Sequence, residues 1–213
     1  MRGAGVWQTQ GELRPISRSD LDRPPVAAAE LLVGAVLQRR GDPEVRVRLV
    51  EVEAYGPDDP ASHAFRGPTA RCAAMFGPPG TAYVYRSYGV HWCVNVSVGG
   101  EGTGAAVLLR SGVVLAGADE VRARRPGVAD AALLRGPGCL TKGLGIDGTL
   151  DGVDLLGPTT PWQLLADDAL LEVAGGPRVG VSRAADLPWR RYVVACAAVS
   201  RYRRSPRAPS TDA

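Results

Sequence analysis

The run Val45-Arg-Val-Arg-Leu-Val-Glu-Val-Glu-Ala-Tyr55 predicts a long β-strand, and with it a fold that contains a sheet. Its apolar residues first alternate with arginines, so residues 45, 47 and 49 share one face of a regular strand. That face continues as Glu51, Glu53 and Tyr55, while the apolar residues move to the opposite face. A strand that carries two carboxylates on its apolar side breaks its own pattern, and such breaks are expected at functional sites.

The rest of the chain predicts an α+β fold with a largely antiparallel sheet, because short strands are mixed with few helices. A helix is expected to open at Pro24-Pro25 and to end at Gly41, since apolar residues recur between them at helical spacing. The other expected elements are a hairpin of strands at 81–85 and 90–98, a short buried strand at 105–109, helical segments at 117–125 and 129–146, and strands near 170–174, 177–182 and 191–198.

One domain over residues 12–201 is the simplest organisation, because no internal repeat or long linker divides the chain. Residues 1–11 lack periodicity, and residues 202–213 are basic, polar and proline-containing, so both ends are expected to be flexible. The N-terminus has no apolar signal region, and no apolar run reaches the roughly 18 residues of a membrane span. We therefore expect a cytoplasmic monomer without a membrane partner.

The charged residues restrict the possible chemistry. Basic residues number 25 against 22 acidic ones, and a net charge of +3 is too small to identify a partner. Lys142 is the single lysine beside 24 arginines, so a Schiff-base mechanism would need Lys142 or the N-terminus. Four widely spaced cysteines and two histidines predict no metal site. The run Gly77-Pro-Pro-Gly-Thr81 is not a P-loop, because Ala82 and Tyr83 stand where lysine and Ser/Thr are required.

Aromatic residues cluster between Tyr55 and Trp92, where seven of the 12 in the chain are found. Tyr83 and Tyr85 share one face of a strand, and Tyr88 precedes Gly89 at the expected hairpin tip. A tyrosine at a tip either packs back on its own hairpin or enters a stack of bases, with the other tyrosines as a pocket for a base. Arg86 beside them could contact phosphate.

Glu53 is a candidate general base, because its strand breaks its pattern there and Tyr55 faces the same way. Glu51 on the same face is the alternative base, and a salt bridge to one of the arginines is an alternative for either carboxylate. Arg110, at the end of an apolar run, could orient such a carboxylate and a water, or only cap the sheet edge. His63 could form a hydrogen bond in a pocket or serve a structural role.

Taken together and in order, these segments resemble the alkyladenine (3-methyladenine) DNA glycosylases, also called methylpurine-DNA glycosylases, and indicate a bacterial member of that family. The resemblance covers roughly residues 13–200. The matching stretches are Val50-Glu-Val-Glu-Ala-Tyr55, Asp59-Pro-Ala-Ser-His63, Met75-Phe-Gly-Pro-Pro-Gly-Thr-Ala-Tyr-Val-Tyr85, Tyr88-Gly-Val-His-Trp-Cys-Val-Asn95, Val107-Leu-Leu-Arg110, Gly136-Pro-Gly138 and Pro177-Arg-Val-Gly-Val181.

The resemblance implies a catalytic centre for hydrolysis of the N-glycosidic bond of a damaged purine. Glu53 would activate the water that attacks the sugar C1′, Arg110 would help to hold that water, and the main-chain carbonyl of Val179 would be a further contact. Direct attack by water agrees with the scarcity of lysine, so no strand-cleaving lyase step, cofactor or metal is implied. The sequence identifies no certain general acid for a neutral base such as hypoxanthine.

The resemblance also implies how DNA would be bound. Tyr55, His63 and Tyr85 would form the walls of the pocket for a flipped base, with Tyr83 in support, and Asn95 would clash with the amino group of normal guanine.

The family further implies a curved sheet flanked by helices, with a protruding hairpin that enters the DNA minor groove. On that hairpin Tyr88 would intercalate, and Arg86 and His91 would support it or contact DNA. The implied partner is double-stranded DNA that contains damaged purines (3-methyladenine, 7-methylguanine, hypoxanthine, ethenoadenine). The implied location is the bacterial nucleoid.

Four residues depart from the family pattern. Cys72 stands where Asn is common and Cys139 where Lys is common, while Ala82 replaces a usual Leu and Val90 a usual Met. None of them is a proposed catalytic or pocket residue, so activity is still expected.

Two other classes of protein remain as alternatives. A non-catalytic minor-groove binding module would gain nothing from two carboxylates facing DNA, and an enzyme for free nucleosides would not need an exposed tip tyrosine.

Overall fold

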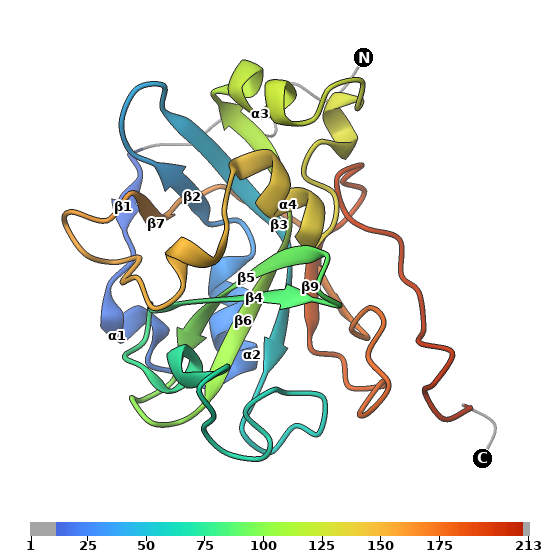
Figure 1. Ribbon diagram of the computed structural model, residues 1–213. Coiled ribbons are helices and arrows are strands. Elements are labelled where there is room, and N and C mark those ends of the chain that lie inside the picture. The colour runs from blue at the N-terminus through green and yellow to red at the C-terminus, as the bar shows by residue number, and fades with distance from the viewer. Residues whose placement is uncertain (1–11, 211–213) are drawn as a thin grey trace.

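A computed structural model describes residues 12–210, and it shows an α+β fold in which few helices pack on one antiparallel sheet (Figure 1). The nine strands of these residues are β1 (Arg14–Pro15), β2 (Val36–Arg39), β3 (Val45–Tyr55), β4 (Ala82–Ser87), β5 (His91–Val98), β6 (Ala105–Ala116), β7 (Trp162–Ala166), β8 (Val173–Gly176) and β9 (Arg190–Val193). The α-helices are α1 (Arg18–Leu21), α2 (Pro25–Leu32), α3 (Ala118–Arg124) and α4 (Pro137–Leu144), and short 3₁₀ helices are η1 (Ala73–Phe76), η2 (Asp130–Ala132) and η3 (Gly148–Leu150).

The long strand β3 is the central strand of the sheet. The order of the main path is β1-β7-β2-β3-β6-β5-β4, and every pairing is antiparallel. One edge of β3 pairs with β6, whereas its other edge is divided between β2 near residues 45–48 and β9 near residues 51–53. Because two partners share that edge, the second half of β3 brings its side chains close to the C-terminal part of the chain.

The phase change in β3 is an irregularity of the strand, with register shifts against β6 between Leu49 and Glu51 and between Glu51 and Val52. The apolar residues on both sides of the shift, at positions 45, 47, 49, 50, 52 and 54, belong to the same buried core cluster. The bulge therefore keeps the apolar residues on the core side, and it leaves Glu51 and Glu53 on the opposite face. The prediction that Glu51 and Glu53 lie on the strand face of residues 45, 47 and 49 is therefore wrong.

The main core lies between the sheet and the helices α2, α3 and α4, which contribute Leu32, Val121 and Leu140. A second, smaller cluster lies beneath the loop that precedes β4. It consists of Ala64, Cys72, Met75, Tyr83 and Ala106, and Tyr85 packs against it. This second cluster therefore supports the wall of the cavity that Tyr83 and Tyr85 line.

The helix expected from Pro24-Pro25 to Gly41 is wrong in its second half, because α2 ends at Leu32 and β2 begins at Val36. Val33 is extended, and Gly34 takes a φ of +97°, a conformation that favours glycine, so the chain reverses there. Val36 and Leu37 are then buried as strand residues paired with β3. Apolar residues at 35 and 36 fit the stripe of a helix and the face of a strand equally well, so periodicity alone could not separate the two.

Other differences concern the ends of elements. The strand expected at 105–109 continues to Ala116, so Arg110 lies in the middle of β6 rather than at its end. The helical segment 129–146 is divided into η2 and α4, because Gly136 takes a φ of +91° and Pro137 opens a new helix. No strand forms at 177–182, and β1, β7 and α1 were not anticipated.

The N-terminal segment 1–11 lies outside the described residues, so its expected flexibility stays a prediction. Residues 202–210 form no helix or strand, and Arg204 pairs with Asp186. Within residues 12–210, no helix combines the length and the apolar character needed to cross a membrane.

Candidate active site

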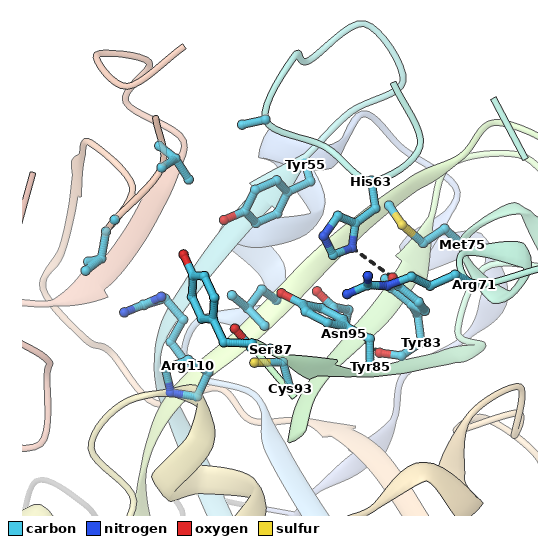
Figure 2. A pocket seen from close by; sticks show the side chains of 17 residues that line it. Tyr55, His63, Arg71, Met75, Tyr83, Tyr85, Ser87, Cys93, Asn95 and Arg110 are labelled. Atoms are coloured by element: carbon cyan, nitrogen blue, oxygen red, sulfur yellow. Dashed lines mark hydrogen bonds between the residues drawn. The ribbon is translucent and has the colours of Figure 1, made fainter. Parts of the chain in front are cut away.

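A cavity of about 630 Å³ opens where β4, β5 and β6 meet the loops after β3 and β8 (Figure 2). The predicted pocket residues Tyr55, His63, Tyr85, Asn95 and Val179 all line it, together with Arg110 and Tyr88. The other lining residues are Ala61, Arg71, Met75, Tyr83, Ser87, Cys93, Leu108, Pro137, Gly180 and Val181. The cavity is much larger than a purine ring, so it has space for a base and part of its sugar.

Glu53 is fully buried directly behind the cavity wall. Its Oε1 accepts a hydrogen bond from the main-chain N–H of Val179 at 2.7 Å, and its Oε2 accepts one from the hydroxyl of Tyr55 at 2.9 Å. Nη1 of Arg110 donates to Oε2 at 3.3 Å. Tyr55, Arg110 and Val179 all line the cavity. These hydrogen-bond donors therefore stand between the Glu53 carboxylate and the cavity.

Sequence reasoning expected the carbonyl of Val179 near the reacting water, whereas the structure brings the N–H of Val179 to Glu53. The described residues supply Oε1 with this single donor, which leaves one lone pair of Oε1 for a further hydrogen bond. Oε2, in contrast, has two donors. The two oxygens of Glu53 are therefore not equivalent.

Glu51 is also fully buried, and like Glu53 it does not itself line the cavity, but its carboxylate is enclosed by more partners. Nε of Arg110 donates to its Oε1 at 3.0 Å, and Nε of Arg190 lies 2.8 Å from the same oxygen. The hydroxyl of Ser200 and the hydroxyl of Ser111 each lie 2.7 Å from a Glu51 oxygen, and the Ser200 N–H donates at 2.8 Å. With four hydrogen-bond donors and the nearby charge of Arg190, Glu51 has little capacity to accept a proton, and Glu53 has the better position for a base.

The two buried carboxylates, Glu51 and Glu53, are balanced by the two buried guanidinium groups of Arg110 and Arg190. Burial by itself would raise the pKa of Glu51, but Arg110, Arg190 and the hydrogen bonds from Ser200 and Ser111 outweigh it and hold the pKa below its usual value. Burial likewise opposes the charge of Arg110, and the nearby Glu53 and Glu51 raise its pKa above the usual value. Arg110 is thus a permanent cation whose guanidinium connects the two carboxylates.

Aromatic rings form the wall of the cavity opposite Tyr55. Tyr83 and Tyr85 stack with ring centroids 5.3 Å apart, as expected for residues on one strand face, and His63 meets the edge of Tyr85 at 4.6 Å. Nδ1 of His63 shares a hydrogen bond of 2.8 Å with the hydroxyl of Tyr83. Such a wall suits the flat faces of a purine, because stacking does not depend on the identity of the base.

The ionisable rings of this wall remain uncharged near neutral pH. Desolvation by the surrounding rings and the charge of Arg71 lower the pKa of His63. Burial raises the pKa of Tyr55, of Tyr83 and of Tyr85 above the usual phenol value. Each tyrosine therefore keeps its hydroxyl proton as a hydrogen-bond donor.

Asn95 is buried on β5 and donates from Nδ2 to the carbonyl of Tyr83 at 2.9 Å. This bond holds the amide beside the tyrosine wall, where a base substituent would meet it. Cys93, two residues earlier on the same strand face, also lines the cavity, and burial raises the pKa of its thiol. Cys93 was not singled out from the sequence, although its alternation with Asn95 in the strand was the available signal.

Arg71 was also missed. Its guanidinium lies over the ring of Tyr85, with Cζ 5.7 Å from the centroid, and Figure 2 shows it beside His63 and Tyr83. An isolated arginine in a polar loop carries no periodic signal, so only the folded chain could identify it.

Tyr88 lies at the tip of the β4–β5 hairpin and is 95% exposed. Val90 N–H donates to the Ser87 carbonyl at 3.0 Å, while Tyr88 and Gly89 take φ values of +50° and +71°. This is the geometry of a type I′ turn, and it is unfavourable for a tyrosine by roughly 1–3 kcal/mol. A bulky ring held in that conformation and in solvent contributes nothing to the core.

The two other predicted hairpin residues, Arg86 and His91, do not line the cavity. Arg86 is exposed and stacks on the ring of Trp92, with Cζ 4.9 Å from the centroid. His91 is exposed at the start of β5 and packs against Gly138, where a β-carbon would come within 2.9 Å of it.

A buried ion pair supports the loop that carries Val179. Both guanidinium nitrogens of Arg178 donate to Asp59, Nη2 at 3.0 Å to Oδ1, and Nη1 also donates to the Ala54 carbonyl at 3.0 Å. The guanidinium lies over the ring of Tyr55, with Cζ 4.6 Å from the centroid, and over that of Trp189. Arg178 thereby holds two donors of Glu53 in place: the ring of Tyr55 and the N–H of its neighbour Val179.

The four departures from the family pattern lie outside this constellation. Cys72 is buried with Sγ 3.1 Å from Oγ1 of Thr69, and Sγ of Cys139 lies 3.1 Å from Nη2 of Arg125. Ala82 is buried in the main core, whereas Val90 is 67% exposed beside Tyr88.

Comparison with known proteins identifies close relatives. The family model described as methylpurine-DNA glycosylase matches residues 19–197. A Nocardia farcinica protein is 53% identical over 203 residues, which cover 91% of this chain and 94% of the relative. A Frankia casuarinae protein is 48% identical over 88% of this chain and 92% of its own, and a Mycobacterium tuberculosis protein is 49% identical over 89% and 95%. Each of the three carries the provisional name 3-methyladenine DNA glycosylase.

Proposed function

Because this chain belongs to the methylpurine-DNA glycosylase family, we propose that it removes alkylated or deaminated purines from duplex DNA by hydrolysing their N-glycosidic bonds. The substrates are 3-methyladenine, 7-methylguanine, hypoxanthine and ethenoadenine, and the product is an abasic site. The observation that carries this proposal is the buried carboxylate of Glu53, which is held by three lining groups of an aromatic cavity. A module that only bound DNA would have no use for that carboxylate.

The damaged base leaves the helix and enters the cavity between Tyr55 and the stacked pair of Tyr83 and Tyr85. Flipping costs a few kcal/mol, and it costs least for a weakly paired lesion. An alkylated purine such as 3-methyladenine carries positive charge, so the electron-rich faces of the tyrosines attract it by about 0.5–2 kcal/mol. Asn95 lies where the exocyclic amino group of normal guanine would clash with it, and it thereby disfavours the undamaged base.

Glu53 acts as the general base. Its Oε1, which has the single donor Val179, accepts a proton from a water placed between the carboxylate and the sugar C1′. Arg110 and Tyr55 hold Oε2 and keep the carboxylate oriented. Attack on the side opposite the departing base resembles inverting glycoside hydrolysis. A positively charged base is already a good leaving group, so proton transfer from water is sufficient.

No lyase step follows. Lys142, the single lysine of the sequence, is exposed on α4 and does not line the cavity. The enzyme is therefore a monofunctional glycosylase that acts without a cofactor, as a monomer in the cytoplasm.

Tyr88 is the intercalating residue. Its ring, exposed on a turn with strained backbone, enters the gap that the flipped nucleotide leaves in the minor-groove side of the duplex. Arg86 and His91, on the two strands that flank this turn, contact the DNA on either side.

Base release from a duplex with one hypoxanthine or one 3-methyladenine tests the proposal. We expect the native protein to release the free base in single-turnover reactions, and Glu53→Gln to lose 10²-fold or more, the scale of general-base catalysis. Glu101→Gln, an exposed carboxylate in the loop between β5 and β6, is the matched control and should retain the native rate.

The outcome separates three functions. Binding without release by the native protein would indicate a DNA-binding module, and release from free nucleosides only would indicate a nucleosidase. Undiminished release by Glu53→Gln would refute Glu53 as the base.

A further inference from the structure

The segment that follows β9 returns to the rim of the cavity, beyond the last residue of the family match at 197. Ser200 donates its N–H to Glu51 at 2.8 Å, and Nη2 of Arg110 donates to its hydroxyl at 3.2 Å. Three residues later, the carbonyl of Arg203 accepts a hydrogen bond of 2.9 Å from the N–H of Gly180. Arg110 and Gly180 both line the cavity, so residues 200–203 are attached to its wall at two points.

We call residues 200–207 the C-terminal arm. Arg204 fixes the arm further, because its guanidinium pairs with Asp186 and donates from Nη2 to the Pro209 carbonyl at 2.7 Å. The side chains of Arg201, Arg203 and Arg207 are exposed, and no described residue forms an ion pair or a hydrogen bond with them. The arm therefore presents three available cations on a backbone that the folded domain holds in place.

Several other exposed arginines of the described chain are held by carboxylates. Arg122 pairs with Asp119 and Asp130, Arg14 pairs with Asp20, and Arg18 pairs with Asp154. The three arginines of the arm have no such partner among the described residues, and they follow one another on a segment that is attached to the cavity wall. Exposed guanidinium groups attract the phosphates of DNA, with two parallel hydrogen bonds where the geometry permits.

We propose that the C-terminal arm binds the sugar-phosphate backbone of DNA beside the flipped nucleotide, through Arg201 and Arg203, with Arg207 further along the strand. This inference rests on the proposed glycosylase function. A base inside the cavity leaves its own phosphates at the rim, because sugar and phosphate follow the base as it rotates outward. Arg203 is adjacent in space to Gly180 of the rim, and Arg201 follows Ser200, which contacts Arg110.

The arm also connects binding to the catalytic group. Its first residue bonds to Glu51 and Arg110, and its fourth bonds to the loop whose Val179 N–H holds Glu53. Phosphate contacts position the duplex and carry no sequence information, so the arm increases affinity for any duplex without selecting the lesion.

The test compares two double variants that remove the same charge. Arg201→Gln with Arg203→Gln changes the arm, and Arg14→Gln with Arg18→Gln changes β1 and α1, which lie on the opposite side of the molecule from the C-terminal chain (Figure 1). Binding of a short duplex that contains a tetrahydrofuran abasic analogue is measured over a range of salt concentrations. Single-turnover release of hypoxanthine at saturating protein is measured in parallel, and thermal unfolding checks that both variants are folded.

We expect the arm variant to bind about tenfold or more weakly near 0.1 M salt, and the slope of log K against log salt to fall in magnitude by up to about 2, since each lost phosphate contact removes roughly 0.9. The release rate at saturation should stay within about twofold of native, and the control should match the native protein in both measurements.

An unchanged slope with normal base release would overturn the role of the arm and leave the glycosylase function intact. A reduced release rate at saturation without a change in slope would also overturn it, because the arm would then act only through Ser200 on the catalytic group. Failure of the native protein to release any damaged base would refute the proposed function itself.

Discussion

Tyr55 donates its hydroxyl hydrogen to Oε2 of Glu53 at 2.9 Å, from a position two residues further along the same strand. Residues at this spacing share one face of a strand, so β3 carries both a residue of the cavity wall and the buried carboxylate of Glu53. The remaining donors of Glu53 come from β6 and from the loop after β8, 57 and 126 positions away in the chain.

Tyr55→Phe keeps the aromatic wall and removes this hydrogen bond. A hydrogen bond to a charged group is worth about 1.5–3 kcal/mol, so we expect base release to slow by roughly 10- to 100-fold while affinity for the damaged duplex changes little. Single-turnover kinetics measured alongside equilibrium binding separate the two effects. Tyr192→Phe on β9 is the control, and equal losses in both variants would contradict the specific role of Tyr55.

The Tyr55 hydroxyl also leads to a prediction for the rate of base release at alkaline pH. Burial, and then the charge of Glu53, raise the pKa of Tyr55 well above 10.0, so its proton remains in place at every pH at which the protein is normally assayed. We therefore expect that a decline in base release between pH 8 and about 10, if one is measured, persists unchanged in Tyr55→Phe. A decline present in the native protein and absent from the variant would contradict this assignment.

Glu51→Gln tests the network behind the base. Removal of one partner from a buried ion pair costs about 3–5 kcal/mol, because Arg190 and part of Arg110 lose their counter-charge. The pKa of Glu51 is lowered in the folded protein, so its contribution is fully present above the usual value of 4.5 and disappears as the pH falls through the folded value. The difference in unfolding free energy between native protein and variant should therefore be largest near pH 7 and shrink below pH 4.5.

Chemical denaturation at several pH values measures this difference. Ser111→Ala removes one hydrogen bond to the Glu51 carboxylate but keeps its charge, so it is the control, with a smaller loss of about 1.5–3 kcal/mol that also shrinks as Glu51 is protonated. A constant difference between native protein and Glu51→Gln down to pH 3 would show that the carboxylate does not titrate as described.

Tyr88→Ser should weaken base flipping without a loss of stability. The ring is 95% exposed, so unfolding should change by less than about 0.5 kcal/mol. Loss of stacking worth about 1–3 kcal/mol should reduce excision of a well-paired lesion by roughly 5- to 150-fold. Leu170→Ser, which removes another exposed apolar side chain, is the control. Equal excision by Tyr88→Ser and native protein would refute the intercalation.

Lys142→Ala should leave base release unchanged, and the native protein should form no adduct with abasic DNA under borohydride. The reason is that Lys142 is exposed on α4, outside the cavity lining. Gel analysis detects a trapped complex directly. Trapping that disappears in Lys142→Ala would identify a lyase lysine, and trapping that persists would point to the N-terminal amine.

Much of the fold could be predicted from local sequence. The bounds of β3 were predicted without error, because its long run of β-branched residues identifies a strand in spite of the phase change. Those of β4 and β5 were predicted within two residues, because apolar and polar residues alternate there. The split of the segment 24–41 into helix and strand could not be predicted, since residues 35 and 36 suit both. The strand β7 was not predicted, although Gly157-Pro158 and Pro161 mark a turn directly before it.

The residues of the site, too, were predicted only in part. Every pocket residue that the family resemblance implied lines the cavity, and Tyr83 and Tyr85, which alternation placed on one strand face, stack on each other there. Arg71 and Arg178 were missed, since a single arginine in a loop shows no pattern until the chain folds.

The linear chain, with its alternation and its ordered motifs, was sufficient to indicate a sheet, an aromatic pocket and a carboxylate on a strand. It could not say which of Glu51 and Glu53 is available for chemistry, because both stand on the same face of one strand. That distinction arises from partners brought together over long separations. Four donors from β6 and the C-terminal arm, and the charge of Arg190 on β9, enclose Glu51, whereas Oε1 of Glu53 has one donor beside an open cavity. Hydrogen-bond saturation of a buried carboxylate is a property of the folded chain, and no local pattern of residues encodes it.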